Sequence, residues 1–220
     1  MILGSGYGQN FYKERISRDN IFTVGIGPSF AYLDNGGGYK ELDFAVKPSL
    51  SIGLIKKVSS RMEFRTSAGF QEISSGGSPT QEMIDIWRLF NSSITVKGAA
   101  YFLDFIPSFY LVPFSNHMER SKVNFYGGAG LGTMLAVSRQ TKSTNPQEKP
   151  YRSSIFTGYI PVRAGLGIRM SPYSDLGAEG MMFWTFSDNL DGNAGYNKFG
   201  DHLFQVQLVF RKYFVPKGME

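Results

Sequence analysis

Asp201 and His202 stand side by side and are the best candidates in this chain for acid–base chemistry. Histidine exchanges protons near neutral pH, and a neighbouring carboxylate can orient its ring. Ser187, in the same polar segment, would supply the nucleophile of a hydrolytic site. Nothing in the spacing of these residues sets their geometry. Hydrolysis is therefore an alternative interpretation, and loss of activity on His202→Ala is its test.

The segment 187–201 is rich in Asp, Asn and Gly, and its side-chain oxygens suit calcium. The candidate ligands are Asp188, Asn189, Asp191, Asn193 and Asp201. Their spacing is not that of an EF-hand, and a solvated loop is the simpler interpretation. The chain has no cysteine and only two histidines, so thiolate zinc sites and a cysteine nucleophile are excluded. We expect no metal and no cofactor.

Glycine strings at residues 25–27, 127–132 and 165–167 resemble fragments of nucleotide-binding loops. That motif opens a helix after a strand, and no helical pattern follows any of these strings. We expect the glycines to relieve crowding between packed strands instead.

Composition narrows the class of protein. Charged residues make up 19% of the 220 residues, against about 25% in an average soluble domain. Aromatics make up 15%, which excludes a disordered chain. The formal charge is +5, but no dense run of Lys and Arg occurs, so we expect no nucleic-acid partner. No uninterrupted stretch of 18 apolar residues predicts a transmembrane helix. Residues 1–9 resemble the end of a truncated signal peptide.

Apolar and polar residues alternate with period two in eight segments, which predicts strands. The segments are 21–33, 41–56, 61–73, 95–113, 123–138, 154–170, 175–186 and 202–214, with a bulge or bend expected around 99–101. They are longer than the strands of about 5 or 6 residues usual in soluble domains. Strands that cross a bilayer need about 9 to 11 residues.

The connections alternate between long and short. The links after the first, third, fifth and seventh segments are long, and the other three are short. This alternation is typical of an up-and-down outer-membrane barrel with short periplasmic turns and long external loops. We therefore predict an all-β, eight-stranded antiparallel transmembrane β-barrel over residues 21–214. Residues 1–20 would be a periplasmic lead-in, and residues 215–220 a tail.

The polar face of these segments mixes small residues with isolated charges and amides, which suits a narrow lumen rather than a water-facing exterior. A soluble lipid-carrying barrel, with its apolar face inward, is the alternative. The expected lumen residues are Lys47, Glu63, Arg65, Arg163, Arg169, Glu179, Gln205, Gln207 and Arg211. We interpret them mainly as a salt-bridge and hydrogen-bond plug, with a conducting or substrate-contacting role as the alternative.

One segment, 79–90, departs from the strand pattern. Ser78 followed by Pro79 is a helix start signal, and four apolar side chains share one helical face. Those side chains are Met83, Ile86, Trp87 and Phe90. We predict a short helix in the second external loop, acting as a lid or interfacial anchor or docking a partner.

Three stretches in the second half of the chain carry a family resemblance. Residues 160–169 alternate with glycine, residues 174–180 contain Leu176-Gly177-Ala178-Glu179, and residues 184–192 read Trp-Thr-Phe-Ser-Asp-Asn-Leu-Asp-Gly. This pattern resembles the PorG-like family of small outer-membrane barrels of the Bacteroidota, which is tied to type IX secretion and gliding. The resemblance implies an outer-membrane anchor that contacts periplasmic ring or scaffold proteins. It implies no catalytic residues.

The predicted topology places the contact surface at residues 10–20 and at the basic turns 57–61 and 114–122. The candidate contact residues are Lys57, Arg61, His117, Glu119, Arg120 and Lys122. We expect a non-enzymatic structural or accessory subunit whose partners are outer-membrane lipid and other envelope or secretion-complex proteins. The alternatives are an outer-membrane lipid-modifying enzyme and a surface ligand-binding barrel that uses the loop 139–153.

Overall fold

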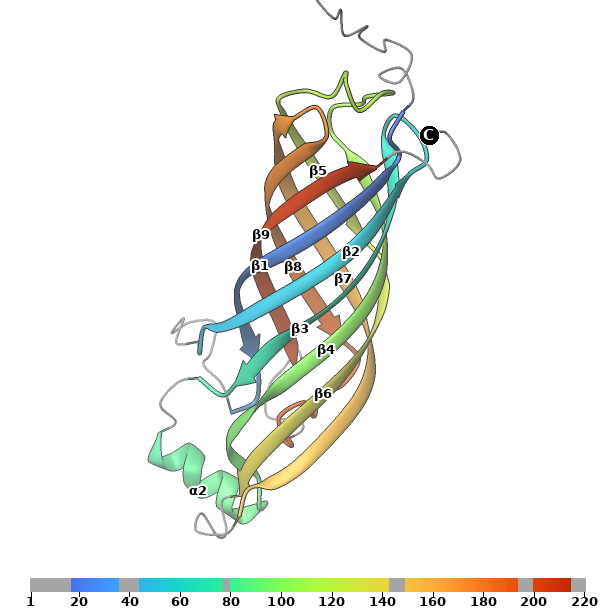
Figure 1. The fold of residues 1–220 in the computed structure, drawn as a ribbon. Helices are drawn as coiled ribbons and strands as arrows, with labels where there is room; N and C mark the ends of the chain where they lie inside the picture. The colour runs from blue at the N-terminus through green and yellow to red at the C-terminus, as the bar shows by residue number, and fades with distance from the viewer. Residues whose placement is uncertain (1–16, 36–43, 77–79, 143–148, 194–199, 215–220) are drawn as a thin grey trace, which may run out of the picture.

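The computed structural model describes residues 17–35, 44–76, 80–142, 149–193 and 200–214. These ranges form a tilted barrel with one short helix at one end (Figure 1). The strands are β1 (Asn20–Tyr32), β2 (Lys47–Lys57), β3 (Met62–Ser74), β4 (Ser93–Tyr110), β5 (Val123–Ala129), β6 (Leu131–Lys142), β7 (Tyr151–Ser171), β8 (Ser174–Thr185) and β9 (His202–Phe214). The helix is α2 (Gln81–Leu89), within the segment predicted to be helical.

Apart from β5 and β6, each strand pairs antiparallel with its neighbours in the chain, and β9 pairs with β1 to close the ring. β5 and β6 both lie between β4 and β7, so they are two parts of the single strand predicted over 123–138. The break falls at Gly130, which lies opposite Pro161 of β7 and beside Pro107 of β4, and neither proline has an N–H to donate. The barrel is therefore the predicted eight-stranded one, with its fifth strand interrupted.

Gly130 also lies at a close approach of two backbones. A Cβ atom at this position would stand 2.0 Å from the carbonyl oxygen of Phe105. Only a residue without a side chain fits such an approach.

The faces of the sheet are arranged inside out relative to a soluble barrel. On β2, Ile52 and Leu54 are 51% and 67% exposed, whereas Ser49 and Ser51 are buried. The same alternation runs along the other strands, with apolar side chains outward and polar ones in the lumen. Such an apolar exterior is stable in a bilayer and unfavourable in water, so the soluble lipid-carrier alternative is wrong.

Two details of the strands differ from the sequence-based expectations. β2 begins at Lys47 rather than at residue 41, and residues 36–43 lie outside the described ranges. The irregularity of β4 falls between Ser93 and Thr95, whereas pairing with β6 is continuous past residues 99–101, where the bulge was expected.

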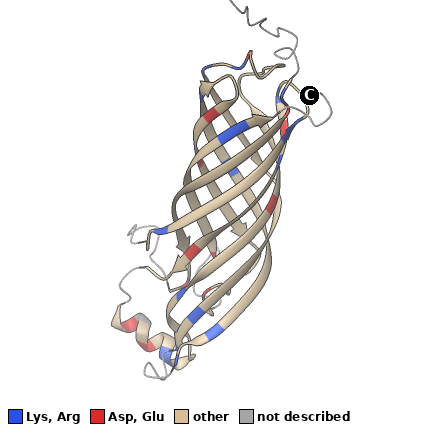
Figure 2. Cartoon of the chain, in the orientation of Figure 1, with Lys and Arg blue, Asp and Glu red and all other residues tan. Residues whose placement is uncertain are grey.

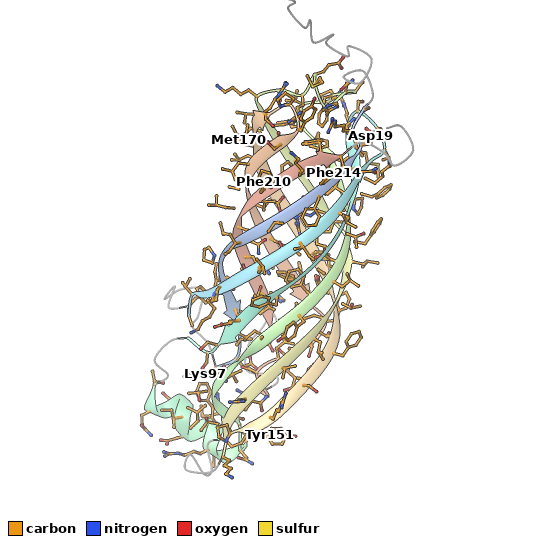
Figure 3. All side chains as sticks on the ribbon, in the orientation of Figure 1. Asp19, Lys97, Tyr151, Met170, Phe210 and Phe214 are labelled. Atoms are coloured by element: carbon orange, nitrogen blue, oxygen red, sulfur yellow. The ribbon has the colours of Figure 1, made fainter. Side chains whose placement is uncertain are left out.

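The two ends of the barrel differ. The long connections and α2 lie at one end of the barrel. The short turns, the first residues of β1 and the last residues of β9 lie at the other end (Figure 1). Figure 3 shows Lys97 and Tyr151 near the first end and Asp19 and Phe214 near the second. In barrels of this type the short turns face the periplasm, so we call the second end periplasmic and the first external. Within the described residues, no helix is long and apolar enough to cross a membrane.

Candidate functional site in the lumen and at the barrel ends

A buried carboxylate between two guanidinium groups forms the centre of the lumen. Glu179 of β8 accepts hydrogen bonds from Arg65 Nη1 at 2.6 Å and from Arg163 Nη1 at 2.9 Å. Tyr126 donates its hydroxyl hydrogen to the Oε1 atom of Glu179 at 2.8 Å. Both ion pairs are almost completely shielded from solvent. Charge-assisted bonds of this kind are short and strong, and they join three separate strands across the interior.

Toward the periplasmic end, a third ion pair fills the lumen. Arg211 Nη2 lies 2.8 Å from Glu63 Oε2, and it also donates to the hydroxyl oxygen of Tyr110 at 2.7 Å. Tyr110 in turn donates to Glu63. Toward the external end, Tyr159 donates to Asp104 at 3.1 Å, and Arg163 Nη2 lies 3.9 Å from the same carboxylate.

The interior charges of this network balance. Its three arginines face three carboxylates, as burial in a low-dielectric interior requires. The five predicted lumen residues within it are Glu63, Arg65, Arg163, Glu179 and Arg211. Such a network fills the space that an open channel would need.

The other four predicted lumen residues divide into two groups. Gln205 donates to Gln71 Oε1 at 2.9 Å and Gln207 donates to Ser49 Oγ at 3.0 Å, both inside the barrel. Lys47 stands half-buried at the external end of β2. Arg169 donates instead to the carbonyl oxygens of Met118 and Arg120 at the periplasmic end.

Sequence reasoning missed the phenols and one carboxylate of the lumen. Asp104, Tyr110, Tyr126 and Tyr159 are all buried and hydrogen-bonded there. Asp104 was the detectable one, because a single carboxylate in the apolar run 98–114 must face the lumen.

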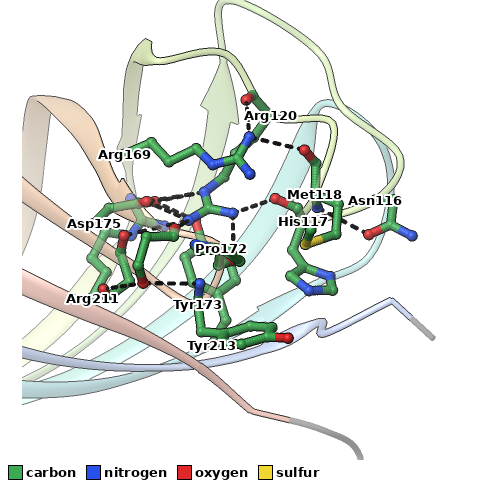
Figure 4. A network of polar contacts seen from close by, with 12 residues as sticks. Asn116, His117, Met118, Arg120, Arg169, Pro172, Tyr173, Asp175, Arg211 and Tyr213 are labelled. Atoms are coloured by element: carbon green, nitrogen blue, oxygen red, sulfur yellow. Dashed lines mark hydrogen bonds and ion pairs between the residues drawn. The ribbon is translucent and has the colours of Figure 1, made fainter. Parts of the chain in front are cut away.

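The periplasmic mouth is closed by a loop tied down through one arginine (Figure 4). Arg120 Nη2 lies 2.7 Å from Asp175 Oδ1, and its nitrogens also donate to the carbonyl oxygens of His117, Ser171 and Pro172. Tyr213 donates to Asp175 Oδ2 at 2.7 Å. The connection between β4 and β5 is thereby fastened to the β7–β8 turn and to β9.

We call this β4–β5 connection, residues 111–122, the periplasmic cap. His117 fastens the segment just before β1 to it. Its Nδ1 atom accepts the backbone N–H of Arg18 at 3.3 Å, and its ring lies against those of Tyr173 and Tyr213. The guanidinium of Arg18 lies 3.8 Å from the centre of the Tyr173 ring. Burial first, and then the charges of Arg18 and Arg120, lower the pKa of His117 to about 4. The ring is therefore neutral at physiological pH, as its acceptor role requires.

The predicted periplasmic contact residues separate into exposed and buried ones. Arg61, Glu119 and Lys122 are exposed. Lys57, His117 and Arg120 are buried within the cap, which corrects the expectation that they present a contact surface. Lys57 Nζ, for example, lies 4.6 Å from the centre of the Phe114 ring. The loop folds back over the mouth and covers these three side chains.

Carboxylates crowd together at the external mouth. Ligand oxygens of Asp34, Asp188 and Asp201 all lie within 4.8 Å of one another, a spacing that could hold a hard cation. Burial first, and then the charges of Asp191 and Asp34, raise the pKa of Asp201 to about 9. Burial likewise raises the pKa of Asp191 to about 7. The cluster of Asp34, Asp188 and Asp201 includes one residue of the first external loop, Asp34, which sequence reasoning missed.

Asp191, another of the calcium candidates, is not among the three carboxylates of that cluster. Asp191 accepts the backbone N–H groups of Asn35 and Asn193 instead. It therefore links the first and last external loops.

The hydrolytic arrangement considered from the sequence is not formed among the described residues. His202 Nδ1 lies 2.7 Å from the backbone carbonyl oxygen of Asp201, to which it donates. The Asp201 carboxylate accepts from Leu190 N instead, at 2.6 Å. The carbonyl oxygen of Ser187 accepts a hydrogen bond from the Thr185 hydroxyl at 3.0 Å. A base oriented by the Asp201 carboxylate is therefore missing.

The apolar face predicted for the loop helix is divided. Trp87 is buried, whereas Ile86 and Phe90 are exposed, and Phe90 lies just beyond the last residue of α2. The side chain of Met83 lies outside the described residues. An exposed apolar surface is thus present at Ile86 and Phe90, without the contribution of Trp87.

Solved structures with the same architecture identify the class. NspA, a neisserial surface protein, gives a TM-score of 0.54 at 12% identity, covering 89% of this chain and 97% of that one. Ail of Yersinia pestis, solved with the heparin analogue sucrose octasulfate, gives 0.50 at 12% identity, covering 89% and 97%. OprG from Pseudomonas aeruginosa gives 0.50 at 8% identity, covering 91% and 98%. The chain has the fold of a small outer-membrane β-barrel.

That fold and the outward apolar face agree on location. A closed antiparallel barrel with lipid-facing apolar side chains belongs in the bacterial outer membrane. No protein-family model matches the sequence, and no curated protein matches it. The resemblance to PorG-like barrels therefore stays a prediction.

Proposed function

We propose that this outer-membrane barrel is a non-enzymatic anchor, a structural or accessory subunit of a larger envelope complex. The observation that carries the proposal is the combination of a lumen filled with paired charges and a tied-down periplasmic cap. A filled lumen favours a role other than transport through the barrel. A cap held by Arg120 and His117 gives a partner a fixed surface to bind, with little ordering cost on association.

The contact surface of this proposal is the exposed part of the periplasmic end. Arg61, Glu119 and Lys122 are exposed there, and a mixture of charges of this kind suits the polar rim of an interface. The larger envelope complex would be the type IX secretion and gliding apparatus, because the resemblance of residues 160–192 to PorG-like barrels implies it.

Site-specific photo-crosslinking in living cells tests this proposal. A photoreactive amino acid at Arg61 or Lys122 is expected to capture an envelope protein, and identification by mass spectrometry should yield a secretion component. Leu54 on the lipid-facing surface is the matched control, because it is 67% exposed but faces the bilayer. Absence of any protein adduct at both periplasmic positions, in a barrel that still resists SDS until heated, would overturn the anchor role. An adduct with a protein outside secretion would overturn the type IX assignment alone.

The enzymatic alternative has its own test. His202→Ala is expected to leave outer-membrane lipid composition unchanged, since the Asp201 carboxylate is not bonded to this ring. A changed acylation pattern on expression of the wild type, lost in the folded variant, would contradict the proposal.

A further inference from the structure

Three basic side chains lie side by side on the outer surface, near the external end of the barrel. Lys97 of β4 is the register partner of Arg139 on β6, and Arg139 is the register partner of Arg152 on β7. All three are exposed and point away from the lumen. Figure 2 shows blue segments on neighbouring strands close to the end that carries α2. We call these three residues the basic row.

Such a row is unfavourable unless something neutralises it. Residues directly opposite on adjacent strands have Cβ atoms about 5 Å apart, and like charges at that separation repel. Among the residues that the structure describes, none of the three makes an ion pair, and the salt bridges found there all involve other side chains. The sheet therefore holds three positive charges together without an internal partner, which points to an external anion.

The level of the row along the barrel indicates which anion. Four residues nearer the bilayer centre on the same face, each strand carries an exposed lipid-facing side chain: Tyr101 on β4, Leu135 on β6 and Phe156 on β7. Four residues of strand span about 13 Å, and the tilt of the strands shortens the height. The row therefore stands just beyond the apolar belt, where the headgroups of the outer leaflet lie.

The row is confined to one side of the barrel. At the same end, the lipid-facing positions of β1, β8 and β9 carry Phe30, Trp184 and Phe204, and the Phe30 and Phe204 rings stack 5.0 Å apart. Aromatic side chains are the usual choice at a membrane interface. On β4, β6 and β7, basic side chains stand in place of this aromatic girdle: Lys97, Arg139 and Arg152.

We propose that the basic row is a binding site for a phosphorylated glycolipid of the outer leaflet, with Arg139 at its centre. A phosphate bound there would accept hydrogen bonds from the guanidinium groups of Arg139 and Arg152 and neutralise Lys97. The acyl chains would lie along Tyr101, Leu135 and Phe156. The site follows from the strand register, the exposure of the three side chains and the external assignment of this end, and it is independent of the proposed anchor role.

Lipid binding to the purified full-length barrel in detergent micelles tests the proposal, with bis-phosphorylated lipid A as the probe. Native mass spectrometry compares the wild type with the variant Arg139→Gln/Arg152→Gln. The matched control is Lys56→Gln/Lys212→Gln, which removes two charges from the outer surface at the opposite end. We expect the first variant to bind at least about tenfold more weakly and the control to bind like the wild type. Arg139→Lys/Arg152→Lys should retain most of the affinity.

Three results would overturn the site. The first is equal binding by the wild type and the Gln variant. The second is unchanged affinity for dephosphorylated lipid A. The third is full competition by inorganic phosphate at the lipid's own concentration, which would indicate a simple anion site. A heat-dependent gel shift verifies that each variant is folded before lipid is added.

Discussion

Glu179→Gln tests how the lumen network stabilises the barrel. Glu179 accepts hydrogen bonds from Arg65 and Arg163 at 2.6 and 2.9 Å, and both ion pairs are shielded from solvent. A glutamine retains one acceptor but turns an NH₂ group toward a guanidinium and leaves the two arginines without their shared negative charge. Breaking a buried ion pair by removal of one partner costs about 3–5 kcal/mol. We expect a loss of that size in the free energy of unfolding.

Urea unfolding in lipid vesicles measures the loss, with the unfolded fraction read from the heat-dependent gel shift. Glu72→Gln is the matched control, because Glu72 is an exposed carboxylate on β3 and its loss should cost under about 0.5 kcal/mol. The double variant Arg65→Gln/Glu179→Gln should recover part of the stability, since it restores the charge balance. If Glu179→Gln unfolds within about 1 kcal/mol of the wild type, water penetrates the lumen and the plug interpretation fails.

Three further outcomes follow from the two mouths and the strand break. Unfolded His117 takes up a proton near pH 6.5 while the native ring stays neutral down to about pH 4, so stability should fall by about 2 kcal/mol between pH 7 and 4.5. Comparison with His117→Gln isolates the part of this loss of stability that His117 causes. An equal fall in the stability of the variant would refute the role of His117. Native Asp201 keeps its proton up to about pH 9 while the unfolded carboxyl loses it near pH 4, so its contribution to stability declines as the pH rises across that window. In EDTA, Asp201→Asn should remove this decline in unfolding titrations between pH 5 and 9, and an unchanged slope would contradict it. Gly130→Ala should abolish the SDS-resistant band, since its Cβ would meet the Phe105 carbonyl oxygen, whereas Gly180→Ala, with open space around it, should assemble normally.

The local alternation of the strands was readable from the sequence. Val206, Gln207 and Leu208 alternate along β9, and the structure places them outward, inward and outward. This works because successive side chains of a strand point to opposite faces whatever the strand pairs with. Composition also indicated which face of each strand points into the lumen, because a face with only isolated charges such as Arg211 does not suit a water-facing exterior.

The loops were less predictable than the strands. His117 and Lys57 looked like exposed basic groups of a turn, yet the β4–β5 connection folds over the mouth and buries both. The carboxylate cluster needed Asp34, which is more than 150 residues from Asp188 in the sequence. A loop's own composition says little about which distant loop it will meet.

The sequence by itself therefore determined the eight membrane-spanning segments, their lipid-facing and lumen-facing sides, and the short helix. Only the tertiary structure decided which inward charges meet, such as Arg65 and Glu179, which are separated by 114 residues. It also brought Lys97, Arg139 and Arg152 into one row. The physical reason is that alternation is a property of one strand, whereas the height at which two residues meet depends on the stagger of all strands around the closed barrel.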